Sequence, residues 1–309
     1  MTRFPDPRRA SRASLLSLAA TALLAVTPVS AQTVVTLPPI QDAHVRDLLP
    51  ASNFGALPEI WFGRGSSFGL GLVRTLVEFD LGALPGPNVK HATFSAWQFA
   101  TEPAAGTIDC QVHRCTTAWT ELGATWDAQP SFDAKSWAEA GVGSGPFGWV
   151  DWDVTALVRD QAAGVLPSLG WLFKVPFETS GISRLGYFHS REFSDAALRP
   201  KLVVELYDLD LAVAQPVPGV PTPIEVDRAN PNEAVALAID FTQLGLTPVV
   251  RLGVVLELHF PSLLALAFAD AQGEVATSVL LPPAVSGAPF WIQAAAVGKL
   301  SNVVALTMP

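Results

Sequence analysis

The sequence contains few residues of the types that form disulfides, zinc sites or nucleic-acid interfaces. Among its 309 residues there are two cysteines, Cys110 and Cys115, and five histidines. Two cysteines without histidines in a spaced set make a poor zinc site. An oxidising compartment would allow a disulfide, but residues five apart in a regular strand point to opposite faces, so pairing requires a bulge or a chain reversal. The sequence alone therefore does not decide whether Cys110 and Cys115 form a disulfide.

Signals of catalysis are also scarce. The glycine-rich segment Gly63–Gly69 has no Lys-Ser or Lys-Thr pair and no following helix, so we interpret it as a hairpin loop. The histidines lack zinc-protease spacing, and we find no serine-hydrolase elbow at a strand-to-helix turn. Asp151 and Asp153 share a strand face, as a glycosidase pair can, but a helix cap and a surface charge are the simpler interpretation. We predict no catalytic residues, with a polysaccharide lyase or hydrolase as an alternative.

The N-terminal segment predicts export. Four arginines precede an apolar run from Leu15 to Val29, and Val29 and Ala31 are small residues at the positions of a cleavage site. This run is shorter than the roughly 20 residues that cross a bilayer, which favours a cleaved signal peptide over a membrane anchor. We expect residues 1–31 to be a signal peptide. The mature chain is then secreted, in the extracellular space or at the cell surface, without stable membrane insertion after cleavage.

The mature chain is acidic. Removing residues 1–31 leaves 19 − 4 = 15 basic and 28 − 1 = 27 acidic residues, so the net charge is 15 − 27 = −12. Non-specific binding to nucleic acid depends on neutralising phosphates with Lys and Arg. We therefore predict no nucleic-acid partner, and the same charge weakens a preference for polyanionic glycans.

Short strands fit the composition better than long helices, because 26 prolines and 23 glycines interrupt a chain that is half apolar. In the upstream part, apolar or alternating runs bounded by turn residues predict the strands Glu59–Gly63, Val73–Asp80, Val89–Phe99, Ile108–Cys115, Val150–Val154, Leu169–Val175 and Lys201–Leu206. One or two helical turns are expected at Asp153–Ala163. This pattern predicts an all-β sandwich.

A second domain is expected downstream. Prolines 216, 218, 221 and 223 favour an extended linker. Beyond it, further apolar runs predict the strands Ala234–Phe241, Val249–His259, Leu263–Ala269, Val275–Leu281, Phe290–Ala296 and Val303–Leu306. We therefore expect residues 32–208 to form the first sandwich, residues 209–223 a proline-rich linker, and residues 224–309 a smaller immunoglobulin-like β-sandwich.

Nine short motifs in the upstream part follow one another in the order of a known family. They are Ile40-Gln41-Asp42, Asn53-Phe54-Gly55, Arg74–Leu81, Trp119-Thr120-Glu121, Ala124-Thr125-Trp126, Trp149–Thr155, Gly170-Trp171-Leu172, Phe188–Glu192 and Arg199–Leu202. Over about residues 40–207 the chain resembles DNRLRE domains, or carbohydrate-binding module family 96. The resemblance implies a jelly-roll-like β-sandwich that binds glycan or acts as a spacer in exported proteins.

Exposed aromatic side chains are the candidate sugar-binding residues, because an exposed indole stacks on the apolar face of a sugar ring. In the strand expected at Val89–Phe99, Trp97 and Phe99 lie on the face opposite Phe94. If the Phe94 face is the interior, Trp97 belongs to an outer aromatic platform. Trp137, in a polar neighbourhood, is the other candidate. Packing in the core or in a loop is the alternative for each of them.

A structural calcium ion is a further hypothesis. Jelly-roll modules of this type often carry one, and Asp42 and Asp153 offer the hard oxygen ligands that calcium prefers. The sequence has no D-x-D-x-D-G loop, so the site would be assembled from distant segments. The alternative is that Asp153 caps the short helix and Asp42 ends a strand.

The main functional prediction is a secreted, non-catalytic carbohydrate-binding or cell-surface adhesion protein, whose partner is a polysaccharide or a cell-surface glycan. It rests mainly on the family resemblance. A purely structural surface or matrix spacer is the first alternative, and the lyase or hydrolase is the second.

Overall fold

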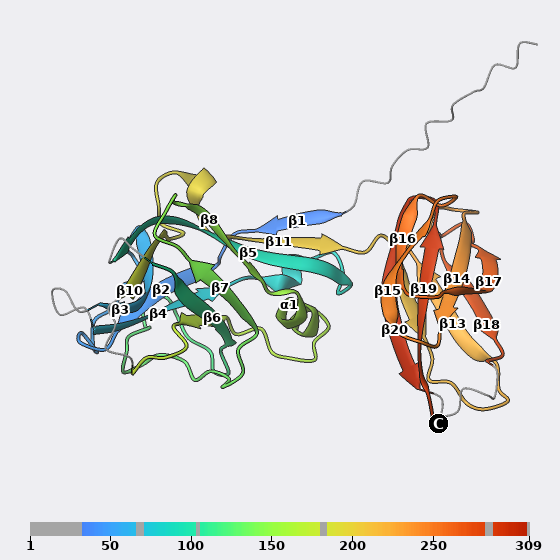
Figure 1. Cartoon of the computed structure of the whole chain (residues 1–309), viewed down its shortest axis with the longest axis horizontal. Helices are drawn as coiled ribbons and strands as arrows, with labels where there is room; N and C mark the ends of the chain where they lie inside the picture. The colour runs from blue at the N-terminus through green and yellow to red at the C-terminus, as the bar shows by residue number, and fades with distance from the viewer. Residues whose placement is uncertain (1–32, 66–70, 103–105, 180–183, 282–286, 308–309) are drawn as a thin grey trace, which may run out of the picture.

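The computed structural model shows two bodies of strands (Figure 1). It describes residues 33–65, 71–102, 106–179, 184–281 and 287–307. The expected signal peptide lies outside the described residues. The structure is all-β, as the sequence predicts. None of the helices in the described part of the chain is long and apolar enough to cross a membrane.

Strands make up nearly all of the regular structure. The first body contains β1 (Val34–Leu37), β2 (Gln41–Arg46), β3 (Glu59–Gly65), β4 (Gly71–Glu78), η2 (Leu81–Ala83), β5 (Val89–Glu102), β6 (Ile108–Arg114), β7 (Ala138–Val142), β8 (Gly148–Asp153), α1 (Thr155–Ala162), β9 (Trp171–Lys174), β10 (Arg184–His189), η3 (Ala196–Leu198) and β11 (Lys201–Leu206). The second body contains β12 (Asp210–Val213), β13 (Thr222–Asp227), β14 (Ala234–Asp240), β15 (Leu244–Val249), β16 (Val254–Leu258), β17 (Ser262–Phe268), β18 (Val275–Val279), β19 (Pro289–Ala296) and β20 (Lys299–Thr307). The short strands β1, β2, β7, β10, β12, β13 and β15 are not predicted from the sequence.

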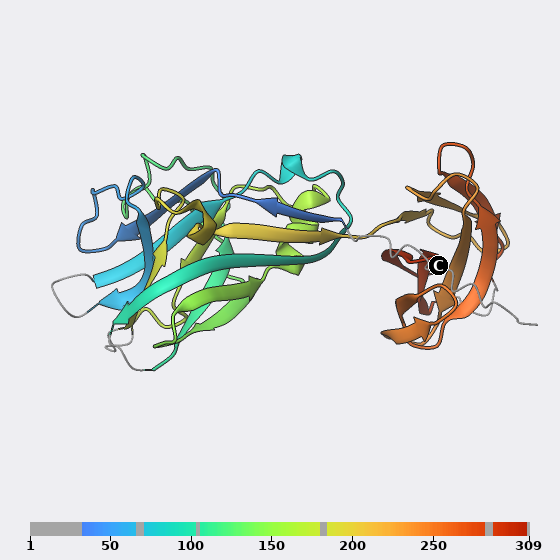
Figure 2. The same cartoon turned by 90° about the horizontal axis from the view of Figure 1, so that it is seen from above.

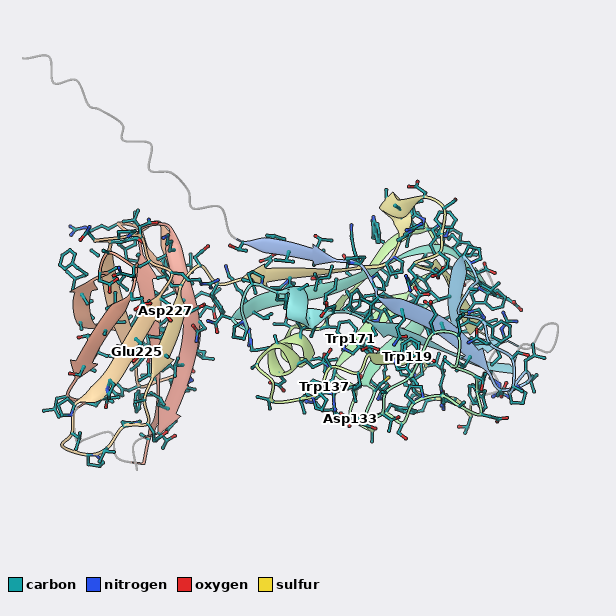
Figure 3. All side chains as sticks on the ribbon, turned by 180° about the vertical axis from the view of Figure 1, so that it is seen from behind. Trp119, Asp133, Trp137, Trp171, Glu225 and Asp227 are labelled. Atoms are coloured by element: carbon teal, nitrogen blue, oxygen red, sulfur yellow. The ribbon has the colours of Figure 1, made fainter. Side chains whose placement is uncertain are left out.

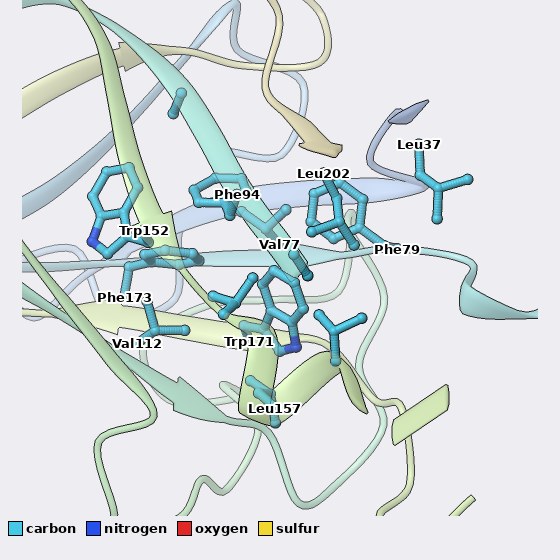
Figure 4. Close-up of a cluster of buried hydrophobic side chains, with 14 of the residues drawn as sticks. Leu37, Val77, Phe79, Phe94, Val112, Trp152, Leu157, Trp171, Phe173 and Leu202 are labelled. Atoms are coloured by element: carbon cyan, nitrogen blue, oxygen red, sulfur yellow. The ribbon is translucent and has the colours of Figure 1, made fainter. Parts of the chain in front are cut away.

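One eleven-stranded sheet forms the first body. Its main path runs β1-β11-β5-β10-β3-β4-β9-β6-β7, while β2 pairs with β4 and β8 pairs with β5. Alternation along each strand turns one set of side chains inward, and the curled sheet buries them in a main core (Figure 4). There the ring of Phe94 lies 4.8 Å from that of Phe173 and 5.3 Å from that of Trp152.

Strand β5 is paired along both of its edges. Strands β10 and β11 pair end to end along one of its edges, and β8 pairs along the other. Between β10 and β11, residues 190–200 leave the sheet and return to it, with η3 on the way. This excursion brings the backbone N–H of Arg191 against Asp42 of β2 and the ring of Phe193 against His189 of β10.

The second body is a small β-sandwich. A sheet of three strands, β12-β13-β18, faces a sheet of four, β17-β14-β19-β20. Side chains from both sheets, among them Ile224, Val226, Leu237 and Ile292, form a separate core. The hairpin of β15 and β16 lies over a smaller cluster that includes Tyr207. This arrangement is consistent with the expected second sandwich.

The connection between the bodies differs from the expected linker. Residues 210–213 form β12, which pairs with β13 from Asp210 opposite Asp227 to Val213 opposite Ile224. The alternation of Leu209 and Leu211 explains the difference, since both side chains are buried in the second core. The proline cluster therefore lies mostly in the turn between two paired strands. The connection itself is the short stretch between β11 and β12 (Figure 2).

Candidate functional site

The outer face of β5 carries aromatic residues. Phe94 and Ala96 are buried in the main core, so Trp97 and Phe99 lie on the opposite face. Trp149 of β8 stands opposite Trp97 in the strand register, and the two indoles meet edge to face with their centroids 5.5 Å apart. Both indoles are partly exposed. Of the two faces that the sequence allowed, the structure thus places Trp97 on the outer one.

Polar side chains surround this indole pair. The hydroxyl of Ser95, on the same face as Trp97, donates to Oδ1 of Asp151 at 2.6 Å. Lys201 of β11 stands opposite Ser95, and its Nζ lies 4.0 Å from the ring centroid of Trp149. We call these five residues the Trp97 face. Sugar sites combine an apolar surface with a few hydrogen-bonding groups, and the Trp97 face offers both.

Phe99 belongs to a stack of three rings. The imidazole of His189 lies 4.9 Å from the ring of Phe99 and 3.4 Å from that of Phe193, in nearly parallel planes. Burial lowers the pKa of His189, which favours the neutral imidazole near pH 7. The stack joins β5 and β10 to the excursion after β10.

A second aromatic group lies across β10, β3 and β2. Trp61 meets Tyr187 edge to face at 4.8 Å and stacks on His44 at 5.1 Å. The guanidinium of Arg46 lies 4.1 Å from the centroid of Trp61 and 4.2 Å from that of Phe54. It also donates to Nε2 of His44 at 2.9 Å. Burial, together with the positive charge of Arg46, lowers the pKa of His44 to about 3, so this imidazole is neutral and accepts.

Neither this second group nor Trp149 as the partner of Trp97 is predicted from the sequence. One signal was available, because Asp42, His44 and Arg46 alternate with Ala43 and Val45. Alternation of this kind indicates a strand whose polar side chains share one face. The structure shows that these three polar side chains are buried.

Trp137 has a different setting (Figure 3). Its ring packs against the main core, and its backbone N–H donates to the carbonyl of Val112 at 2.8 Å. The Nζ of Lys135 lies 3.3 Å from the ring centroid and occupies a face that a sugar would need. No cation covers the indole of Trp97 among the described residues. The geometry therefore favours Trp97 over Trp137 as a stacking residue.

The two aspartates of the calcium hypothesis do not belong to one group. Asp42 is buried on β2 and lies with Glu121 and Glu192, where one oxygen of each residue is within 4.8 Å of the others. We call these three residues the acidic cluster. Asp153 is outside it, with a side chain that is 70% exposed. Its Oδ1 accepts from the backbone N–H of Thr155, the first residue of α1, at 3.0 Å. Asp153 thus binds the first N–H of α1 from the position before the N-cap, Val154, which itself makes no side-chain cap hydrogen bond. The expected pairing of Asp153 with Asp42 is wrong, because Asp153 lies outside the cluster.

The carboxyl groups differ in acidity. Burial raises the pKa of Asp42 well above its usual value, and the charges of Glu192 and Glu121 add to this effect. Burial also raises the pKa of Glu192. In contrast, the hydrogen bond with Thr155 lowers the pKa of Asp153. The general acid of a glycosidase requires a raised pKa, so Asp153 is poorly suited to that role.

Both cysteines are free and buried. Cys110 lies in the main core and Cys115 in a different apolar cluster, as expected for strand residues five apart. Burial raises the pKa of Cys115 to about 12 and that of Cys110 well above its usual value. Because the thiolate is the reactive form, neither cysteine is suited to act as a nucleophile.

A comparison with family models assigns the first body. The model of carbohydrate-binding module family 96 matches residues 33–206, more than half of the chain. The chain belongs to carbohydrate-binding module family 96. The match ends at Leu206, the last residue of β11, so the family 96 module coincides with the first body. The role implied for this module is carbohydrate binding.

Other comparisons add little beyond the family 96 module. No curated protein matches the chain. Among solved structures, the crystal structure of red sea bream transglutaminase is similar at 9% sequence identity and a TM-score of 0.20, over 88% of this chain and 31% of that one. The chain therefore spans less than a third of the length of that protein.

Proposed function

We propose that the chain is an exported, non-catalytic protein whose family 96 module binds a polysaccharide or a cell-surface glycan on the Trp97 face. The observation that carries the proposal is the outer position of Trp97, braced edge to face by Trp149 and flanked by Ser95, Asp151 and Lys201. The indole supplies a flat apolar surface for a sugar ring. The carboxylate of Asp151, which accepts from the buried hydroxyl of Ser95, and the ammonium group of Lys201 supply hydrogen bonds to sugar hydroxyls.

Two properties of the proposal rest on other observations. Export rests on the arginines and the apolar run of residues 1–31. The non-catalytic role is supported by the membership of the first body in a family of carbohydrate-binding modules. A cell-surface adhesion role would follow if the bound glycan belongs to a cell surface.

A glycan array probed with residues 32–309 tests the proposal and identifies the sugar. Isothermal titration with the strongest hit should then show that Trp97→Ala weakens binding by roughly tenfold or more, since 1.4 kcal/mol is one decade of affinity. Phe177→Ala is the matched control, because Phe177 is an aromatic residue of the same module that is 76% exposed and lies outside the Trp97 face. Its affinity should equal that of the parent chain.

Two outcomes would contradict the proposal. If a folded Trp97→Ala variant binds with the same affinity as the parent, the Trp97 face is not the binding site. An array without binding would favour the structural spacer instead. Incubation with the same glycans should release no new chain ends, and their release would make the chain a lyase or hydrolase.

A further inference from the structure

Three carboxylates from distant parts of the chain meet in the acidic cluster. Asp42 lies on β2, Glu121 lies between β6 and β7, and Glu192 lies in the excursion between β10 and β11. One oxygen from each residue lies within 4.8 Å of the other two. Calcium binds oxygens at about 2.3–2.6 Å, so two oxygens on one ion are at most roughly 5 Å apart. The spacing of the cluster fits a single ion of this size.

The cluster also contains buried oxygens without partners. The side chain of Asp42 is 1% exposed, and its Oδ2 accepts from the backbone N–H of Arg191 at 2.8 Å. Its Oδ1 is buried and has no hydrogen-bond partner among the described residues, and the same holds for Oε2 of Glu192. Removing a carboxylate oxygen from water without giving it a hydrogen-bond or ionic partner costs free energy. These oxygens therefore point to a ligand that completes the cluster.

Arg191 compensates only part of this negative charge. Its Nη1 lies 3.1 Å and 3.2 Å from the two oxygens of Glu121, and it donates to the carbonyl of Ile40 at 2.6 Å. Its Nε lies 3.5 Å from Oε1 of Glu192. A bound cation favours the ionised form of all three carboxyl groups, and with the one guanidinium these leave two negative charges. The unpartnered oxygens belong to the two residues, Asp42 and Glu192, that Arg191 satisfies least. A divalent cation would balance both.

We propose that Asp42, Glu121 and Glu192 form a calcium site in the family 96 module. All ligands of the cluster are carboxylate oxygens, which suit hard cations and not the nitrogen and sulfur sites of zinc. Calcium accepts six to eight oxygens in an adaptable geometry and completes its shell with water. Magnesium demands a near-ideal octahedron and loses water reluctantly, so the buried oxygen of Asp42 suits it less. The bound ion ties β2 and the Glu121 segment to the excursion that carries Phe193.

Calorimetry and thermal unfolding of residues 32–309 test the site without any glycan, so the result is independent of the proposed function. Titration of calcium chloride into chelator-treated protein should show one ion per chain. At a hundredfold excess over the dissociation constant, the melting temperature of the first body should rise by roughly 5–10 °C. Magnesium should give a much smaller rise. Absence of calcium binding, or an unchanged melting temperature, would overturn the proposal.

Glu192→Gln is the decisive variant, because the amide keeps the shape of the side chain and removes its charge. Calcium should no longer raise its melting temperature, whereas in chelator it should be at least as stable as the parent, since one buried like charge is gone. Asp42→Asn should behave in the same way. Asp153→Asn is the matched control, as an acidic residue of the same module outside the cluster, and should keep the full response. A Glu192→Gln variant with an undiminished calcium response would refute the assignment.

Discussion

The two bodies of this chain bury different kinds of side chains. Eight of the nine tryptophans lie in the family 96 module, and only Trp291 lies in the second body. The module also buries the charged or titratable groups of Asp42, His44 and Arg46, which cost free energy when they leave water. The described part of the second body buries one charged residue, Asp240, whose carboxylate accepts hydrogen bonds from Thr242 and from the backbone N–H of Phe260. The second body has a mainly aliphatic core and exposes aliphatic side chains such as Leu246 and Val250.

This difference supports the proposal that the first body recognises the glycan. Aromatic surfaces and buried polar groups are features of binding sites, where local rules of stability are broken. The module contains both, on the Trp97 face and in the acidic cluster. The second body contacts the end of the module through Tyr207, whose hydroxyl donates to Glu257 at 2.7 Å and 2.9 Å. We infer that recognition belongs to the first body and that the second supports it.

The largest loss of stability is expected when a large aromatic side chain is removed from the core of either body. Trp152 is buried, packs against Phe94 and Phe173, and donates from Nε1 to the carbonyl of Cys110 at 3.1 Å. Trp152→Ala should destabilise the first body by about 3–5 kcal/mol. Phe290→Ala is the corresponding change in the second core. Calorimetry should show that each variant lowers one transition only, and a joint shift of both would mean that the bodies unfold as one unit.

The pH dependence of stability should come in part from His44. Its pKa falls from 6.5 to about 3 on folding, so below pH 6.5 the unfolded chain binds a proton that the folded chain refuses. The neutral, buried imidazole of His44 therefore contributes fully to the free energy of unfolding above pH 6.5, and this contribution is lost as the pH falls towards 3. His44→Gln keeps an acceptor for Arg46 and removes the titration.

Urea unfolding at pH 7 and pH 4, followed by tryptophan fluorescence, measures this contribution. The parent should lose more stability between the two pH values than His44→Gln, by a difference of the order of a few kcal/mol. Parallel losses in the two proteins would show that His44 does not titrate as the buried imidazole requires.

The junction between the bodies should give the smallest effect on stability. Tyr207→Phe removes the hydrogen bonds to Glu257 and should cost about 1.5–3 kcal/mol, as for bonds to charged groups. Because Tyr207 joins the bodies, its loss should move the two calorimetric transitions further apart. Tyr187→Phe is the matched control, since the hydroxyl of Tyr187 donates to Glu102 within the module. Identical calorimetric traces for the two variants would contradict a bridging role for Tyr207.

The sequence predicted much of the fold, because strand periodicity is a local property. The alternation around Phe94 defined two faces of β5, and only packing against the rest of the sheet could decide between them. The linker was mispredicted at its start, because proline content outweighed the alternation of Leu209 and Leu211. The alternation of Leu209 and Leu211 produces a strand because both side chains pack into the second core, which a local sequence pattern does not show.

The candidate sites were less predictable, for a physical reason. Asp42 meets Glu121 and Glu192 across 79 and 150 positions of the chain, so no spacing rule connects them. Asp153 was grouped with Asp42 on chemistry alone, without information on distance. Trp149 was visible as an aromatic residue, but its register against Trp97 follows from the pairing of β5 with β8.

The central claim, that recognition occurs on the Trp97 face of the first body, is tested most directly by the indole N–H signals of the nine tryptophans in an NMR titration. With ¹⁵N-labelled protein and the glycan identified on the array, the signals of Trp97 and Trp149 should shift most as the ligand is added. Tryptophan-to-phenylalanine variants assign each signal. The signals of the buried Trp152 and Trp171, and of Trp291 in the second body, should stay in place. A saturating shift of Trp291 without a shift of Trp97 would place recognition in the second body and contradict the account.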